Sequence, residues 1–276
     1  MTTRADAEPL SKGLLTPVRE VPGAGAPVRI VRRAPTGRAA AFVRHYWLPR
    51  WDLTLTGPLR QDVLEYPTAN LVVERRAAAL HRAHRGMSSR VLEDRGWAFG
   101  VLLNPGVARG WTGVTVRSLP WILPLERLVV PGTAAMREQV RERMEAGDDA
   151  SAVEAFEAWL DGLPEPDDDA RLVDRIVAAV EADRELLRVE QLADRFGVGV
   201  RHLQRLVAGH IGFGPKWLIQ RYRLQEAAAA LRTAGAPSLA QLAAELGYAD
   251  QAHFSREFRA VIGSTPGGYA AAERPR

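Results

Sequence analysis

Two separate groups of polar side chains have the types and spacing needed to recognise the edges of nucleic-acid bases. The groups are Arg201, Gln204 and Arg205, and then Gln251, Ser255 and Arg256. Arginine binds guanine through two parallel hydrogen bonds, glutamine binds adenine in the same bidentate way, and serine pairs with several base edges. Residues three and four apart lie on one face of a helix. Each group therefore predicts a surface that reads the major groove.

Each group falls in one copy of a repeated pattern. The residues Gln-Leu-Ala occur at 191–193 and again at 241–243, and a glycine follows each copy, at Gly197 and Gly247. Glycine adopts the left-handed conformation that ends many helices. The pattern therefore predicts a helix, a tight turn and a second helix in both places, which is the helix-turn-helix arrangement.

The second helix of each copy is expected near residues 199–210 and 250–262, and we name these helices reader 1 and reader 2. Asp250 is a strong N-cap for reader 2, whereas Gly199 is a weaker cap for reader 1. Apolar pairs four residues apart predict a buried stripe on each reader. The pairs are Leu203 with Val207, and Phe254 with Phe258. A helix from Pro215 to about Thr233 is expected to join the two copies.

The alternative is that these polar residues are solvated faces of an ordinary helical bundle. A single copy would leave that alternative favoured. Two copies joined by a helix favour DNA reading.

This region resembles the AraC/XylS-type bacterial transcription regulators over about Val189–Tyr269. The resemblance is carried by Gly247-Tyr248, Phe254, Arg256, Phe258-Arg259, Gly263, Thr265-Pro266 and Tyr269, and more weakly by Leu203-Gln204-Arg205, Gly212, Gly214-Pro215 and Tyr222-Arg223-Leu224. It implies base contacts at Arg201, Gln204 and Arg205 in reader 1, and at Gln251, Ala252 and Arg256 in reader 2. It also implies double-stranded DNA and the transcription machinery as partners.

The sequence departs from the family pattern at two positions in the first copy. Gly199 stands where the family commonly has serine, and Val207 where it commonly has phenylalanine, so looser packing is expected there. In the second copy, Ala252 offers only an apolar contact, for instance to a thymine methyl group. Three further segments resemble a subgroup with a poorly characterised β-rich N-terminal domain; they are Val43-Arg44-His45-Tyr46-Trp47, residues 100–106 and residues 214–219.

The elements that must position these residues predict an α+β fold. Short apolar or alternating runs at 42–47, 63–66, 70–74 and 97–103 predict strands, and helical periodicity follows residue 133. The expected division is a flexible lead-in over 1–36, a β-rich regulatory domain over 37–132, an acidic helical linker over 133–169, and an all-α domain with two helix-turn-helix units over 170–276. The proline-rich acidic stretch at 163–169 marks the clearest boundary.

Charge is distributed unevenly along the 276 residues. Residues 1–136 hold 19 basic and 10 acidic residues, residues 137–187 hold 6 and 16, and residues 188–276 hold 12 and 7. The basic C-terminal part suits phosphate binding. The phosphate contacts that we expect there are Arg195, Lys216, Arg221 and Arg259.

Composition excludes several classes of protein. The chain has no cysteine, so disulfides, thiolate metal sites and cysteine nucleophiles are ruled out. No apolar run is long enough to span a membrane, and the N-terminal residues lack the apolar core of a secretory signal, so a cytoplasmic location is expected.

Enzymatic signatures are also missing, since the chain has no phosphate-binding loop, nucleophile elbow, zinc-protease or dinucleotide motif. His81 and His84 lack convergent carboxylates, and a solvated basic segment is favoured over a metal site. His45 is favoured as a strand residue over a catalytic base, and His253 lies on reader 2. We therefore expect no catalytic residue, no cofactor and no metal.

The function of the N-terminal domain stays open between two interpretations. Its tryptophans could line a pocket for a small-molecule effector, or they could form an ordinary core in a module that makes a homodimer. The acidic segment could support pairing or only separate the domains. The alternative for the whole chain is a ligand-binding or enzymatic N-terminal domain as the primary activity, with the helical part as an interaction module.

Overall fold

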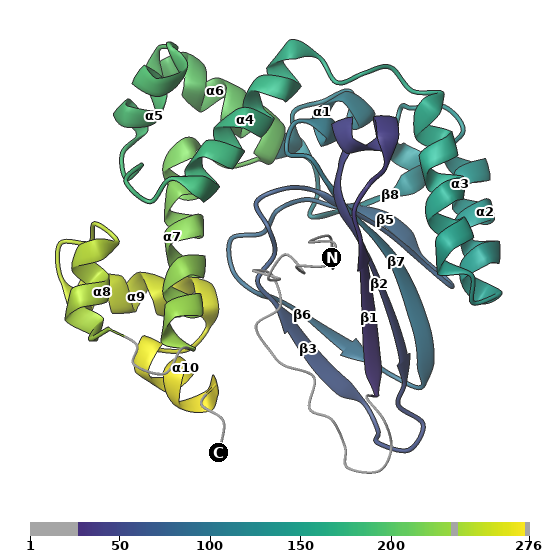
Figure 1. The fold of residues 1–276 in the computed structure, drawn as a ribbon, viewed down its shortest axis with the longest axis horizontal. Helices are drawn as coiled ribbons and strands as arrows, with labels where there is room; N and C mark the ends of the chain where they lie inside the picture. Colours follow the sequence, from purple (N-terminus) through teal and green to yellow (C-terminus); the bar gives the residue numbers. More distant parts are fainter. Residues whose placement is uncertain (1–26, 233–236, 274–276) are drawn as a thin grey trace, which may run out of the picture. The chain divides into compact units, whose positions relative to one another are not determined.

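The computed structural model describes residues 27–232 and 237–273, and the chain within it forms two compact units (Figure 1). Among the described residues, the first unit contains 27–81, 88–104 and 122–165. The second contains residues 82–87 and 105–121 and the described residues from 166 onward. Each unit is therefore assembled from segments that are not contiguous in the sequence.

The first unit is built on two antiparallel sheets. The larger sheet has the strand order β1-β2-β7-β4-β5-β8, and β3 pairs with β6 in the smaller one. The strands are β1 (Val28–Arg33), β2 (Val43–Asp52), β3 (Leu59–Val63), β4 (Asn70–Glu74), β5 (Ala78–His81), β6 (Ser88–Leu92), β7 (Arg95–Leu103) and β8 (Ile122–Pro124).

Two glycines of β7 let tryptophan rings lie flat across the neighbouring strand. A Cβ atom on Gly100 would come within 1.9 Å of the Trp47 ring, and one on Gly96 within 2.2 Å of the Trp51 ring. Both tryptophans lie on β2, which pairs with β7. The indole nitrogen of Trp47 donates a hydrogen bond to Asn70 on β4 at 3.0 Å. The central three strands are therefore tied together by one side chain as well as by the backbone ladder.

A helical hairpin covers this sheet, formed by α2 (Thr133–Glu145) and α3 (Asp149–Asp161). Its buried residues recur at helical spacing, with Met136, Val140 and Met144 on α2. Three short 3-10 helices also belong to the described chain: η1 (Gly37–Ala41), η2 (Val116–Ser118) and η3 (Leu125–Arg127).

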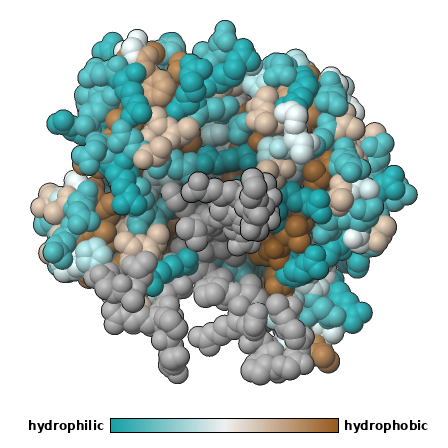
Figure 2. All heavy atoms as spheres, in the orientation of Figure 1, coloured by the Kyte–Doolittle hydropathy of each residue, from teal (hydrophilic) through white to brown (hydrophobic). Residues whose placement is uncertain are grey.

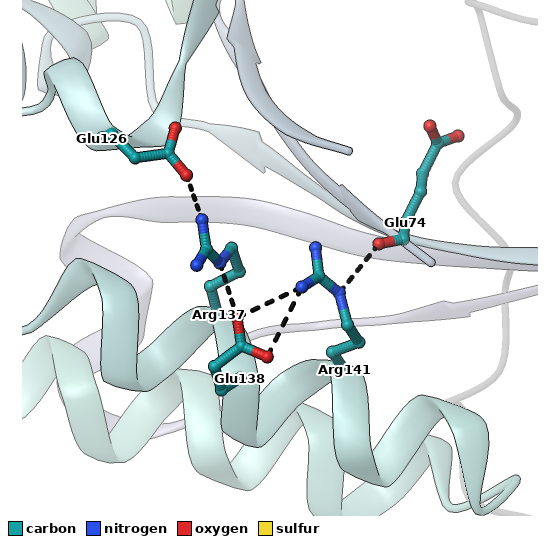
Figure 3. Close-up of polar contacts among 5 residues, drawn as sticks. All are labelled: Glu74, Glu126, Arg137, Glu138 and Arg141. Carbon is teal, nitrogen blue, oxygen red and sulfur yellow. Dashed lines mark hydrogen bonds and ion pairs between the residues drawn. The ribbon is translucent and has the colours of Figure 1, made fainter. Parts of the chain in front are cut away.

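Charged side chains fix α2 to the strand and the turn beside it (Figure 3). Arg137 pairs with Glu126 of η3 and with Glu138 of its own helix. Arg141 also contacts Glu138, and its Nε donates a hydrogen bond to the backbone carbonyl of Glu74 on β4 at 3.2 Å. These contacts hold α2 in one register against the sheet.

Three expectations from the sequence need correction here. The sequence predicts a lead-in that runs to residue 36, but Val28–Arg33 forms β1, because its apolar residues pair with β2. The acidic linker expected over 133–169 is helical, but α2 and α3 belong to the first compact unit, because their apolar stripes pack against other elements of that unit. The strand expected at 63–66 ends at Val63. The remainder of the lead-in, residues 1–26, lies outside the described residues.

The second unit is helical. Its helices are α1 (Val107–Thr112), α4 (Asp168–Ala182), α5 (Val189–Phe196), α6 (Val200–Ile211), α7 (Pro215–Leu231), α8 (Leu239–Glu245), α9 (Gln251–Ile262) and α10 (Pro266–Glu273). One apolar cluster joins α4, α5, α6 and the first half of α7, with Val173, Leu192, Leu203 and Leu218 at its centre.

Residues 105–121, which we name the docked segment, belong to this helical unit although they directly follow β7. The segment contains α1 and η2, and both contact α6. Its residues Val107, Ala108, Trp111 and Val116 are buried. Among the described residues, no helix is both long and apolar enough to cross a membrane.

Candidate nucleic-acid interface

Reader 1 is α6, and the structure builds it as the sequence predicts. Helix α5 ends at Gly197, whose φ of 63° is the left-handed conformation expected for that glycine. Leu203 and Val207 are buried, as the apolar stripe requires. The three proposed base-reading residues, Arg201, Gln204 and Arg205, are all exposed.

Reader 2 is α9, and its local structure repeats that of reader 1. Gly247 has a φ of 75° after α8. The rings of Phe254 and Phe258 are buried and meet edge to face, with centroids 5.6 Å apart. The proposed contacts on this helix share an outward orientation. Gln251, Ala252 and Arg256 are exposed, and Ser255 is partly exposed.

The two readers differ in how their first turns are capped. The side chain of Asp250 accepts a hydrogen bond from the backbone N–H of His253 at 2.7 Å, as expected of an N-cap. Gly199 begins reader 1 with no side-chain hydrogen bond. Reader 1 therefore leaves more of its first backbone N–H groups for other acceptors, such as phosphate oxygens.

Each reader also has a histidine at its third helical position, His202 in α6 and His253 in α9. The sequence pattern used to find base-reading residues does not identify His202. His202 Nδ1 lies 3.2 Å from Nη2 of Arg205. His253 Nε2 lies 3.5 Å from Glu257, which also accepts a hydrogen bond from Gln220 of α7. The equivalent position of the two histidines follows from aligning the N-caps, a signal already present in the sequence.

The predicted phosphate contacts have different environments. Lys216 and Arg259 are exposed. Arg195 is exposed as well, but it forms an ion pair with Asp183. That pair and backbone hydrogen bonding lower the pKa of the Asp183 carboxyl, with the bond from the Glu185 N–H as the largest cause. Binding of phosphate by Arg195 would compete with this ion pair.

The prediction for Arg221 is wrong. Its side chain is buried, and its guanidinium donates a hydrogen bond to the carbonyl of Arg85 at 3.4 Å. The guanidinium also lies 5.9 Å from the Trp217 ring centroid. Arg85 belongs to residues 82–87, which join the helical unit from a distant part of the chain. The sequence around Arg221 could not reveal that residues 82–87 cover its side chain, because they are distant in the chain.

The linker helix α7 is buried on more than one side, since Arg223 and Gln225 are also inaccessible. Arg223 pairs with Glu226 at 2.7 Å and donates to the carbonyls of Asp183 and Leu186. Buried charges need such partners. They tie α7 to the connection between α4 and α5, and therefore to the first helix-turn-helix.

His45 and His81, in strands of the first unit, are partly buried. Burial and the nearby Arg32 and Arg44 lower the pKa of His45 to about 4. Burial, with a smaller effect from Arg90, lowers the pKa of His81 to about 4. In the part of the chain that the structure describes, no three histidine, aspartate or glutamate residues gather as metal ligands would.

Figure 2 shows one face of the molecule, on which hydrophilic residues predominate over the region of α5 and α6 in Figure 1.

The C-terminal region is therefore a double helix-turn-helix domain. Each of its two reader helices has a polar exposed face and an aromatic or aliphatic buried face, and α7 joins the two copies.

Comparison with known families agrees with that class. Residues 192–272 match a family described as "Helix-turn-helix domain", and residues 31–120 match a "Domain of unknown function (DUF6597)". Both parts of the expected resemblance are thus confirmed as matches: the C-terminal residues are similar to a helix-turn-helix family, and the N-terminal residues to a domain that is uncharacterised.

The curated relatives that the chain matches are described as helix-turn-helix-type transcriptional activators or regulators. The transcriptional activator RhaS of Escherichia fergusonii is 33% identical over 136 residues, which is 45% of this chain and 49% of that protein. RhaS of Pectobacterium carotovorum is 36% identical over 75 residues, 27% of this chain and 26% of that protein. The chain thus matches about half of the first relative and a quarter of the second.

Two solved structures show a limited likeness to this chain. The C-terminal domain of AraT, a response regulator from Geobacillus stearothermophilus, has a TM-score of 0.35 at 23% identity, over 38% of this chain and 88% of that one. ToxT from Vibrio cholerae has a TM-score of 0.39 at 12% identity, over 88% of this chain and 96% of that one.

Proposed function

We propose that this protein is a sequence-specific DNA-binding transcription regulator that reads two successive major-groove segments with α6 and α9. The observation that supports this most strongly is the pair of equivalent helices, each with a buried apolar stripe and an exposed set of arginine and glutamine or serine side chains. Arginine and glutamine recognise guanine and adenine, so the two sets would specify sequence.

The linker helix has a length that suits this arrangement. Its 17 residues span about 25 Å at 1.5 Å per residue, and successive major-groove segments on one side of the duplex are about 34 Å apart. Affinity would come mainly from phosphate contacts, for which Arg195, Lys216 and Arg259 are the candidates, and from helix N-termini. Base edges would then set the specificity.

The β-rich part would modulate this binding through a small-molecule effector, a partner or a second copy of the chain. The transcription machinery would be the further partner, and the cytoplasm the place of action, because that is where a bacterial-type regulator meets its DNA. We expect no enzymatic turnover. The similarity of the curated relatives to this chain supports regulation over catalysis.

The proposal is tested by selecting bound sequences from random duplex DNA with the full chain. We expect one site with two conserved segments about ten base pairs apart, centre to centre. On that site, Arg205→Ala and Arg256→Ala should each weaken binding by about 1–3 kcal/mol. Each substitution should also relax the base preference in one segment only.

Arg127→Ala is the matched control, because Arg127 is an exposed arginine in the first unit. It removes the same charge and should leave the base preference unchanged. A selection that yields no preferred sequence, together with equal loss in all three variants, would mean that the chain binds DNA only through its charge.

A further inference from the structure

Just after β7, two residues that are separated by one position form hydrogen bonds to different parts of the chain. Asn104 is bonded within the first unit: its backbone N–H donates to Phe42 at 2.8 Å, and its side-chain amide donates to Ala40 at 2.9 Å. Two residues later, the backbone N–H of Gly106 donates to Oδ1 of Asp174 on α4 at 2.8 Å.

Only Pro105 separates these two attachments, and its ring fixes one of the two backbone dihedrals. The docked segment therefore begins directly after the last residue that is bonded within the first unit. The match to the domain of unknown function continues past Pro105 to residue 120. The docked segment is therefore part of that N-terminal sequence family, although it packs in the helical unit.

The approach of Gly106 to α4 is too close for any other residue. A Cβ atom at this position would lie 2.4 Å from the carbonyl oxygen of Ala170 and 2.5 Å from its Cα. Both are backbone atoms, which cannot move aside as a flexible side chain can. By contrast, a Cβ atom on Gly110, in the short helix α1 of the same segment, would have nothing within 4 Å.

The other end of the docked segment lies against reader 1. Arg109 Nη1 would be 3.6 Å from a Cβ atom on Gly209, and Val116 Cγ1 would be 3.5 Å from one on Gly212. Gly209 and Gly212 are at the C-terminal end of α6. The segment therefore contacts the C-terminal end of reader 1, whereas the proposed base-reading residues lie nearer its N-terminal end. It supports the helix without contacting those residues.

We propose that Gly106 and Asp174 form a positioning contact, through which the docked segment sets the orientation of reader 1 on its DNA segment. This inference rests on the proposed function. The two residues touch no base in this scheme; they act through α4 and α6. Reader 2 is not part of the contact, so the effect should be confined to one half of the bound site.

The test uses the full chain with Gly106→Ala, and with Gly110→Ala as the matched control. Gly106→Ala forces the segment away from α4. We expect the affinity for the selected site to fall about tenfold, a typical size for coupling between sites. Footprinting should show the loss in the reader 1 half only, and amide hydrogen exchange should become faster in α6 than in α9. Gly110→Ala should change none of these quantities.

A second pair of variants separates positioning from a general loss of folding. Asp174→Asn keeps an oxygen that can accept the Gly106 N–H, whereas Asp174→Ala removes it. We expect Asp174→Ala to reproduce the one-sided loss and Asp174→Asn to restore binding. This pair decides the question if Gly106→Ala also loses protection in α9.

Three results would separate the possible failures. If wild type shows no preferred DNA sequence, the proposed function fails. A second result is that wild type binds one site, and that Asp174→Ala and Gly106→Ala bind this site as tightly as wild type does although amide exchange in α6 is faster. The positioning role is then wrong, while the proposed function stands. An equal loss in both halves of the site would also overturn it, because the contact would then be needed only for folding.

Discussion

His45 and His81 illustrate how a single residue type changes its meaning with its surroundings. Histidine is a common catalytic base and metal ligand, yet both residues lie in strands, His45 in β2 and His81 in β5. Burial is the main reason that the pKa of each falls to about 4. A strand histidine of this kind is neutral at pH 7, and its protonation competes with folding.

These two histidines predict acid sensitivity of the first unit. The pKa of histidine in an unfolded chain is about 6.5, so between about pH 6.5 and pH 4 the unfolded chain binds protons that the folded chain does not. The free energy of unfolding should therefore be highest above pH 6.5 and fall as pH decreases, by at most about 1.4 kcal/mol per pH unit for each histidine.

Urea denaturation from pH 7.5 to 4.5 measures this slope, with His45→Gln and His81→Gln as variants that cannot take up the proton. Each variant should have a shallower slope than wild type in this window, although carboxylates contribute to both. A slope that is the same in wild type and in both variants would contradict the assignment.

At the scale of helices and strands, the ends of the helices are the features that the local sequence predicts well. The sequence predicts Asp250, Gly197 and Gly247 as helix-starting or helix-ending residues, and each has the expected geometry. Their effect depends only on the adjacent backbone, so the sequence is sufficient to recognise it. The reader helices are predictable for this reason, and so are their exposed faces.

The unequal caps lead to a prediction about the two readers. Asp250→Ala should destabilise α9 by about 1 kcal/mol, because the N–H of His253 loses its acceptor. Gly199→Ala should cost less, since Gly199 provides no side-chain hydrogen bond. Amide hydrogen exchange of the first turn of each reader measures both effects.

Asp250→Asn is the control for the cap, because asparagine has the same acceptor and about the same preference for this position. It should retain the protection of the wild-type turn. Equal losses from Asp250→Ala and Asp250→Asn would show that the carboxylate charge, and not the hydrogen bond, stabilises the start of α9.

The failures of sequence reasoning occur where residues distant in the chain come together. The sequence predicts Arg221 on the surface, but residues 82–87 cover it. It also predicts the docked segment in the β-rich domain, but Gly106 bonds to Asp174, 68 residues away. Neither contact has a local periodicity or turn signal, because each is decided by packing between separate elements.

The whole molecule therefore does not divide at the acidic proline stretch alone. A fragment that begins at residue 166 would keep both readers but lose the docked segment and residues 82–87. It would expose the parts of α4 and α6 that the docked segment contacts. Such a fragment is expected to be less stable than the same helices in the full chain.

The contribution of the docked segment to stability can be measured with the fragment 166–276 and a synthetic peptide of residues 105–121. Losing the contacts of Trp111 and Val116, both buried, should lower the free energy of unfolding of the fragment by about 2–5 kcal/mol, in the range of large-to-small changes in a core. A saturating amount of the peptide should raise the thermal midpoint of the fragment, because a ligand that binds only the folded state stabilises it.

The same peptide with Gly106→Ala is the control, since its extra Cβ atom collides with the Ala170 backbone and it should bind far more weakly. Stabilisation by the wild-type peptide alone would mean that the helical unit is completed by a segment from the N-terminal part of the chain. If neither peptide changes the midpoint and the fragment is as stable as the helices in the full chain, the docked segment contributes nothing to that unit. The boundary predicted near residue 170 would then describe a self-sufficient domain.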